Sequence, residues 1–271
     1  MNYTAGPEYN QIHKELEVGA GAGAVLGFRH AIGNQLAAFL SKTLSGYRRL
    51  DTVTVDAVAE ILRPGDVVLV EGGTRISVAI KYLTQSSWSH ACLFVGESGS
   101  SSHEPCLLEA DLQEGVRLIP LQHYSGFNLR ICRPVRLTDQ DRLRLIRHAR
   151  SRLGHTYDLK NVWDLVRFLI QKPAVPNRWR RAMIGLGSGE PTRAICSTLI
   201  AESFQSINYP ILPVLGPEVG VEGEVPVYYR RHFSHFTPRD FDLSPYFEVI
   251  KPTLELGFDY QQISWAGEED S

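Results

Sequence analysis

The chain has 271 residues, of which 43% are hydrophobic, and its 28 basic and 30 acidic side chains give a formal net charge of −2. This length supports one sizeable domain with additions or two small domains, and the small net charge provides no large field that would draw the chain to nucleic acid. The four cysteines, at 92, 106, 132 and 196, form no C-x-x-C pair, so no zinc site, disulfide framework or cofactor is expected.

The N-terminal part, 1–59, is expected to form a helical extension. Residues 1–17 lack the basic start and apolar core of a signal peptide, and the apolar run 18–27 is too short to span a bilayer. Apolar residues then follow a helical period over 29–47. This helix would either pack on the rest of the chain or contact a membrane surface or partner. Basic residues that suit an anionic surface are Arg29, Lys42, Arg48 and Arg49.

The remainder, 60–271, is expected to be one domain of class α+β, with an antiparallel sheet packed against helices. A short helix or turn is predicted over 54–62. Apolar runs between turn residues predict strands at 66–71, 90–96, 106–111, 115–121 and 128–135. Thr138 is the expected N-cap of a helix over 139–153 that Gly154 ends, and a second helix is expected over 158–170. The segment 240–247 is expected to be a C-terminal arm laid over the core.

Cys196 lies in the first turn of a predicted helix. Apolar residues at 195, 199, 200 and 204 give this helix one buried face. The unpaired N–H groups at a helix start favour a thiolate and could hold an oxyanion. Cys196 is therefore either a candidate nucleophile or one more small buried residue.

His90 begins one predicted strand, and Glu109 lies on the next strand at hairpin spacing. The two side chains can touch if they share a face of the sheet. His90 would then take the proton of the Cys196 thiol, and Glu109 would hold the other ring nitrogen. Cys92 shares the strand face of His90 and is a rival nucleophile, but a strand interior offers no oxyanion donors.

These features occur in an order that resembles the circularly permuted branch of the NlpC-like papain superfamily, specifically the YiiX/YaeF-like proteins. The matching elements are P-G-D at 64–66, S-H at 89–90, E-A at 109–110, G-x-x-Y-D at 154–158 and C-S at 196–197. The resemblance covers roughly 60–250 and implies a permuted papain-like fold whose cysteine, histidine and acidic residue are Cys196, His90 and Glu109. The family often has Cys-Ser-Glu, and Thr198 stands in place of that glutamate here.

Three further residues are candidates for contact with substrate or oxyanion. By the resemblance, the hydroxyl of Tyr157 would lie near the nucleophile; the alternative is an ordinary half-buried tyrosine. The connection 171–194 is rich in Pro, Gly and Arg, and its Arg178 and Trp179 could line a cleft, or the segment could be a solvated surface loop. His232 and His235 have no clear third ligand, so no metal role is expected for them.

The sequence therefore predicts a cysteine hydrolase that cleaves an amide bond in a peptide, a cell-wall peptide or an acyl-amino acid through a thioester acyl-enzyme. A lipid esterase or acyltransferase is the first alternative, because the superfamily also includes proteins similar to lecithin:retinol acyltransferase. A catalytically silent binding module of the same fold is the second. The expected partners are small-molecule, peptide or lipid substrates. The expected location is cytoplasmic by default, with peripheral membrane contact or non-classical secretion as alternatives.

Overall fold

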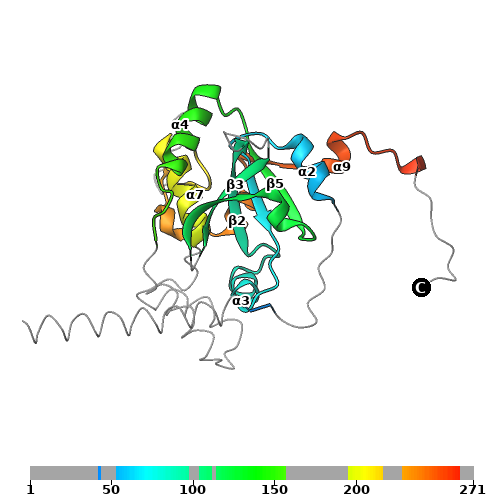
Figure 1. Cartoon of the computed structure of the whole chain (residues 1–271). Helices are drawn as coiled ribbons and strands as arrows, with labels where there is room; N and C mark the ends of the chain where they lie inside the picture. Colours follow the sequence, from blue (N-terminus) through cyan, green and yellow to red (C-terminus); the bar gives the residue numbers. More distant parts are fainter. Residues whose placement is uncertain are drawn as a thin grey trace, which may run out of the picture.

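A six-stranded antiparallel sheet forms the centre of the computed structural model, which describes residues 42–43, 53–97, 104–111, 114–156, 195–215 and 228–262. Its strand order is β4-β3-β2-β1-β5-β8 (Figure 1). The strands are β1 (Val67–Val70), β2 (His90–Glu97), β3 (Pro105–Asp111), β4 (Gly115–Pro120), β5 (Leu129–Pro134) and β8 (Phe247–Ile250). A separate pair of short strands consists of β6 (Val214–Leu215) and β7 (Tyr228–Tyr229). The five strands predicted from the sequence are confirmed, each within two residues at either end.

The described helices are mostly short and surround this sheet. They are α2 (Val55–Ile61), α3 (Arg75–Thr84), α4 (Asp139–Arg150), α7 (Ile195–Ser206), α8 (Pro238–Leu243) and α9 (Pro252–Glu255), with 3-10 turns η1 (Leu121–Tyr124), η2 (Phe233–His235) and η3 (Tyr260–Gln262). The expected α+β class, with an antiparallel sheet against helices, is confirmed.

Both faces of the sheet are covered, because every side chain of β1 is buried. On one face, Leu93 and Leu108 join Leu199 and Phe204 of α7 in a single apolar core. On the other face, a second core joins sheet residues to side chains of α2 and η1. The alternation of side chains along each strand explains this division into two cores.

Local signals set the ends of the helices. The Thr138 hydroxyl accepts a hydrogen bond from the backbone N–H of Asp141 at 3.1 Å, which caps α4 as expected. The regular helix ends at Arg150, three residues earlier than predicted, and a turn follows that closes at Gly154 with a φ of +78°. Glycine reaches this left-handed region without a steric penalty, so it ends the segment.

Of the N-terminal part, 1–59, the structure describes 42–43 and 53–59. Thr43 forms an isolated bridge with Thr74, and the Lys42 carbonyl accepts a hydrogen bond from Arg75 N at 3.1 Å. The helix expected over 29–47 therefore does not run through 42–43, because their backbone groups pair across the chain; the rest of that prediction lies outside the described residues. No described helix is long and apolar enough to cross a membrane.

The segment predicted as a C-terminal arm contributes Phe241 and Phe247 to the apolar core, and an unpredicted strand begins at its end. β8 pairs with β5 at the edge of the sheet. Asp242 accepts hydrogen bonds from Trp88 Nε1 at 3.2 Å and from Arg130 Nη1 at 2.6 Å, and the Arg130 guanidinium lies 4.8 Å from the centre of the Trp88 ring. This cluster ties the arm to the segment that immediately precedes His90.

Candidate active site

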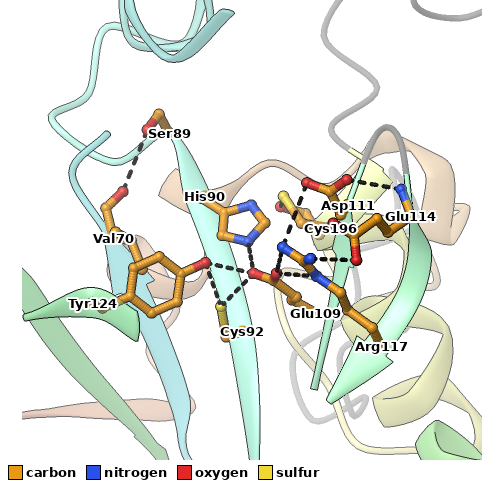
Figure 2. A network of polar contacts seen from close by, with 11 residues as sticks. Val70, Ser89, His90, Cys92, Glu109, Asp111, Glu114, Arg117, Tyr124 and Cys196 are labelled. Carbon is orange, nitrogen blue, oxygen red and sulfur yellow. Dashed lines mark hydrogen bonds and ion pairs between the residues drawn. The ribbon is translucent and has the colours of Figure 1, made fainter. Parts of the chain in front are cut away.

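His90 and Glu109 form a close polar pair on neighbouring strands. Nε2 of His90 lies 2.8 Å from Oε2 of Glu109 (Figure 2). Leu93 pairs with Leu108, which sets the register of the antiparallel strands β2 and β3. In this register Glu109 lies opposite Cys92, and His90 is the diagonal neighbour of Glu109 on the same face of the sheet. The two residues that the sequence predicted to share a face are thus in contact.

The backbone just before His90 is held by Ser89. The Ser89 hydroxyl accepts from Gly72 N at 2.9 Å and donates to the Val70 carbonyl at 3.4 Å. A Cβ on Gly72 would lie 2.3 Å from the hydroxyl of Ser77, so only glycine fits at this close approach. These contacts determine where β2 begins and therefore where the imidazole is presented.

Glu109 has two further strong partners, on β4 and η1. Nε and Nη2 of Arg117 each lie 2.9 Å from Oε1, and the hydroxyl of Tyr124 donates to Oε2 at 2.5 Å (Figure 2). Only 2% of the surface of Glu109 is exposed. Burial alone would raise the pKa of its carboxyl, but the hydrogen bonds and charge of His90, with those of Tyr124 and Arg117, lower that pKa to about 2. Glu109 is therefore an anion at neutral pH.

Cys196 lies at the start of α7, with its thiol close to His90 (Figure 2). The apolar side chains of Leu199 and Phe204 anchor α7 against the sheet, so the helix start is held beside β2. Burial opposes ionisation of the thiol, but the charge and hydrogen bond of His90, a backbone hydrogen bond from Ala91 and the Ser197 hydroxyl outweigh it, and the pKa of Cys196 is lowered. The residue is 4% exposed.

His90 connects the thiol to the carboxylate. Because Glu109 occupies Nε2, Nδ1 is the ring atom that remains for Cys196. Burial favours the neutral ring, but the negative charges that Cys92 and Cys196 carry when ionised raise the pKa of His90 well above its usual range. The imidazole side chain is 24% exposed. A thiolate and an imidazolium can therefore coexist in this pair.

Cys92 differs from Cys196 in its surroundings. It is completely buried, and its Sγ lies 3.7 Å from Oε2 of Glu109 and 3.6 Å from the hydroxyl of Tyr124. Burial, together with the charge of Glu109, raises the pKa of this thiol above its ordinary value despite the opposing charge of His90. Cys92 therefore ionises less readily than an ordinary thiol.

One group of side chains among the described residues has the composition of a metal site. Donor atoms of His90, Cys92 and Glu109 lie within 4.8 Å of one another. Both oxygens of Glu109 already accept hydrogen bonds, from Arg117 on one side and from His90 and Tyr124 on the other. A metal ion would have to replace several of these contacts.

The remaining predicted site residues divide into two groups. Tyr157, Arg178 and Trp179 lie outside the described residues. His232 is described, and its Nδ1 lies 2.8 Å from the hydroxyl of Ser234, while its ring centre is 5.8 Å from that of His235.

Sequence reasoning did not identify Arg117 and Tyr124 as part of the site. A signal for Arg117 was present, because the hairpin predicted between 106–111 and 115–121 places Arg117 opposite Glu109, and this pairing is observed. Tyr124 lies on a short 3-10 turn after the last residue of β4, where periodicity carries no information about orientation.

Comparison with known proteins places the site in a family context. Residues 61–167 match the model of the family described as permuted papain-like amidase enzyme, YaeF/YiiX, C92 family. The chain is also similar to the crystal structure of metalloprotein yiiX from Escherichia coli O157:H7, at 16% sequence identity and a TM-score of 0.44, over 70% of this chain and 96% of that chain. No curated protein matches the chain.

The family match includes His90, Glu109, Arg117 and Tyr124 and ends before Cys196. Its matched segment contains most of the central sheet, from β1 to β5, together with α4. Residues 61–167 are thus similar to the permuted papain-like amidases of the YaeF/YiiX type, and this similarity supports a papain-like cysteine hydrolase.

Proposed function

We propose that this chain hydrolyses an amide bond, with Cys196 as nucleophile, His90 as general base and acid, and Glu109 as the residue that orients His90. The observation that carries the proposal is that one imidazole lies 2.8 Å from an ionised carboxylate and close to a thiol of lowered pKa. A nucleophile, a base and an orienting group in contact are the arrangement that nucleophilic catalysis requires.

In the proposed reaction, the Cys196 thiolate attacks the carbonyl carbon, and a C–S bond forms. The start of α7 supplies the backbone N–H of Cys196 to the oxyanion. Nδ1–H of His90 then gives its proton to the leaving nitrogen as the C–N bond breaks, which leaves a thioester. Water attacks that thioester after losing a proton to His90, and the thiolate returns with the imidazolium.

The choice of an amide rests on the family, which is described as one of amidases. Peptides, cell-wall peptides and acyl-amino acids are the substrate classes to test first. A lipid ester remains the other class. Both classes would use the same nucleophile, so the test below separates them by which substrates are hydrolysed.

The experiment measures hydrolysis of a panel of peptide amides, acyl-amino acids and lipid esters by the full chain. Cys196→Ala and His90→Ala should each abolish turnover, and Cys132→Ala and His232→Ala, which alter a thiol and an imidazole outside the site, should leave it intact. Mass spectrometry of the quenched reaction should find the acyl group on the peptide that contains Cys196. Turnover that survives both site substitutions would refute the mechanism, and cleavage of esters alone would refute the choice of an amide.

A further inference from the structure

The carboxylate of Glu109 accepts hydrogen bonds from side chains other than His90, and both of its oxygens have such partners. Oε1 faces both Nε and Nη2 of Arg117 at 2.9 Å, and Oε2 faces His90, Tyr124 and Cys92. Charge-assisted hydrogen bonds of this kind are the stronger ones in proteins and impose orientation as well as energy. The carboxylate plane therefore has little freedom to turn.

Tyr124 can act on Glu109 in only one way. Burial, followed by the charges of Cys92 and Glu109, raises the pKa of the Tyr124 phenol, so the hydroxyl stays protonated and donates to the carboxylate. The ring is fixed by edge-to-face packing, with centres 5.4 Å from Phe127 and 5.2 Å from His123. A rigid ring therefore holds one donor on Oε2.

The position of the Arg117 side chain is also fixed by its neighbours. It stands opposite Glu109 in the β3–β4 ladder, and its Nη1 lies 2.7 Å from Oε2 of Glu114. The turn that sets this register contains Gly115 at a φ of +73°, where an added Cβ would lie 2.4 Å from the carbonyl oxygen of His155. The guanidinium is thus placed on Oε1 by the hairpin itself.

From this geometry we infer that Tyr124 and Arg117 are positioning residues for catalysis, which act through Glu109 to keep Nδ1 of His90 on the Cys196 thiol. The inference rests on the proposed function and adds two residues to it. If either donor is lost, the carboxylate can rotate and the imidazole can leave the thiol. Loss of the Arg117 charge also makes the site less favourable for a thiolate, so both effects reduce the reactivity of Cys196 at low pH.

The test is the pH profile of Cys196 alkylation by iodoacetamide, followed by peptide mapping of the full chain. The readout is the rate at pH 6 divided by the rate at pH 9.5, where an ordinary thiol also ionises. A thiolate held by His90 gives a high ratio, and a thiol that has lost His90 gives a low one. Because the rate at pH 9.5 corrects for simple access to the thiol, a loosened structure alone would not lower the ratio.

Tyr124→Phe keeps the ring and removes one hydroxyl, so the ratio should fall about tenfold, and Arg117→Gln should lower it about 100-fold. Arg117→Lys, which restores the charge but places its donors on a single nitrogen atom, should recover part of the loss. The matched controls are Tyr209→Phe, which removes a hydroxyl bonded to two carbonyls elsewhere, and Arg133→Met, which removes the arginine of the buried pair with Asp66. Both controls should leave the ratio unchanged.

The outcomes separate the inference from the function on which it rests. If His90→Ala lowers the ratio while folded Tyr124→Phe and Arg117→Gln both keep the wild-type value, the positioning role is overturned and the Cys196–His90 pair stands. If the wild-type ratio is already low, or His90→Ala leaves it unchanged, the proposed function fails and the positioning role fails with it. Should Arg117→Gln not fold, Tyr124→Phe alone decides the question.

Discussion

Oε2 of Glu109 lies 2.8 Å from Nε2 of His90. An ionised carboxylate only accepts hydrogen bonds, so Nε2 must carry a proton. In the proposed mechanism this leaves Nδ1 to exchange the proton of the Cys196 thiol. The tautomer of His90 is then decided by Glu109, which lies 19 positions further along the chain.

Glu109→Gln should lower the catalytic rate while leaving the size of the side chain almost unchanged. The amide of glutamine carries no charge to stabilise the imidazolium. Its NH2 group is also a donor, and it would face side chains that themselves donate hydrogen bonds to Glu109. Since positioned acid–base groups contribute roughly 10²- to 10⁴-fold, we expect kcat/KM to fall by about 100-fold or more. The measurement is steady-state hydrolysis of the best substrate from the amide panel.

The matched control for that change is Asp66→Asn. Asp66 is also a buried carboxylate paired with an arginine of the same sheet, Arg133, at 2.8 Å, but it does not contact His90. Asp66→Asn should spare kcat/KM. Equal activity of Glu109→Gln and the wild type would contradict the orienting role.

Acid should remove stability that Glu109 provides. The pKa of its carboxyl falls from 4.5 to about 2 in the folded chain, so its contribution is present above the unfolded pKa and is lost as pH falls from about 4.5 to about 2. A shift of this size corresponds to about 3 kcal/mol of unfolding free energy. Urea unfolding at a series of pH values measures it.

The comparison for this prediction is again Glu109→Gln, whose stability should depend less on pH within that window. Asp66 cannot account for the same loss, because burial outweighs Arg133 and raises the pKa of Asp66, which gives the opposite sign. Parallel curves for Glu109→Gln and the wild type between pH 5 and 2 would show that Glu109 is not the group responsible.

Among the four cysteines, Cys196 should be alkylated first by iodoacetamide near neutral pH. The pKa of Cys196 is lowered, whereas burial raises the pKa of Cys92, and burial with the charge of Asp242 raises that of Cys132 to about 12. Thiolates are the reactive form, so the rates should differ accordingly. Peptide mapping after brief exposure measures the order, and the urea-unfolded chain, where all four should react alike, is the reference. Labelling of Cys92 as fast as Cys196 would go against this assignment.

Chelation should leave hydrolysis unchanged. His90, Cys92 and Glu109 have the donor types of a metal site, but Arg117 and Tyr124 occupy the carboxylate oxygens that a metal would need. Thiol chemistry in the proposed mechanism uses no metal ion. Activity before and after dialysis against EDTA, with metal content measured in parallel, tests this expectation; activity that is lost with the metal and restored on adding it back would favour a metal at these three residues.

The strands could be located from local pattern alone. Period-2 runs and bounding turn residues mark β1 to β5, and Thr138 marks the start of α4, because these signals depend on neighbours a few residues away. The pairing of Glu109 with Arg117 could also be predicted from local sequence, since a short hairpin sets its register. The sequence analysis did not predict α3, although Thr74 caps its start.

By itself, the sequence determined the α+β class, the five strands from β1 to β5 and the three residue types of the candidate site, because local periodicity and short motifs encode them. Only the tertiary structure decided that Cys196 meets His90, that Tyr124 reaches Glu109 and that β8 completes the sheet beside β5. These contacts join residues far apart in the chain or on irregular turns. They depend on how two apolar cores pack against opposite faces of one sheet, and no local pattern of residues specifies that packing.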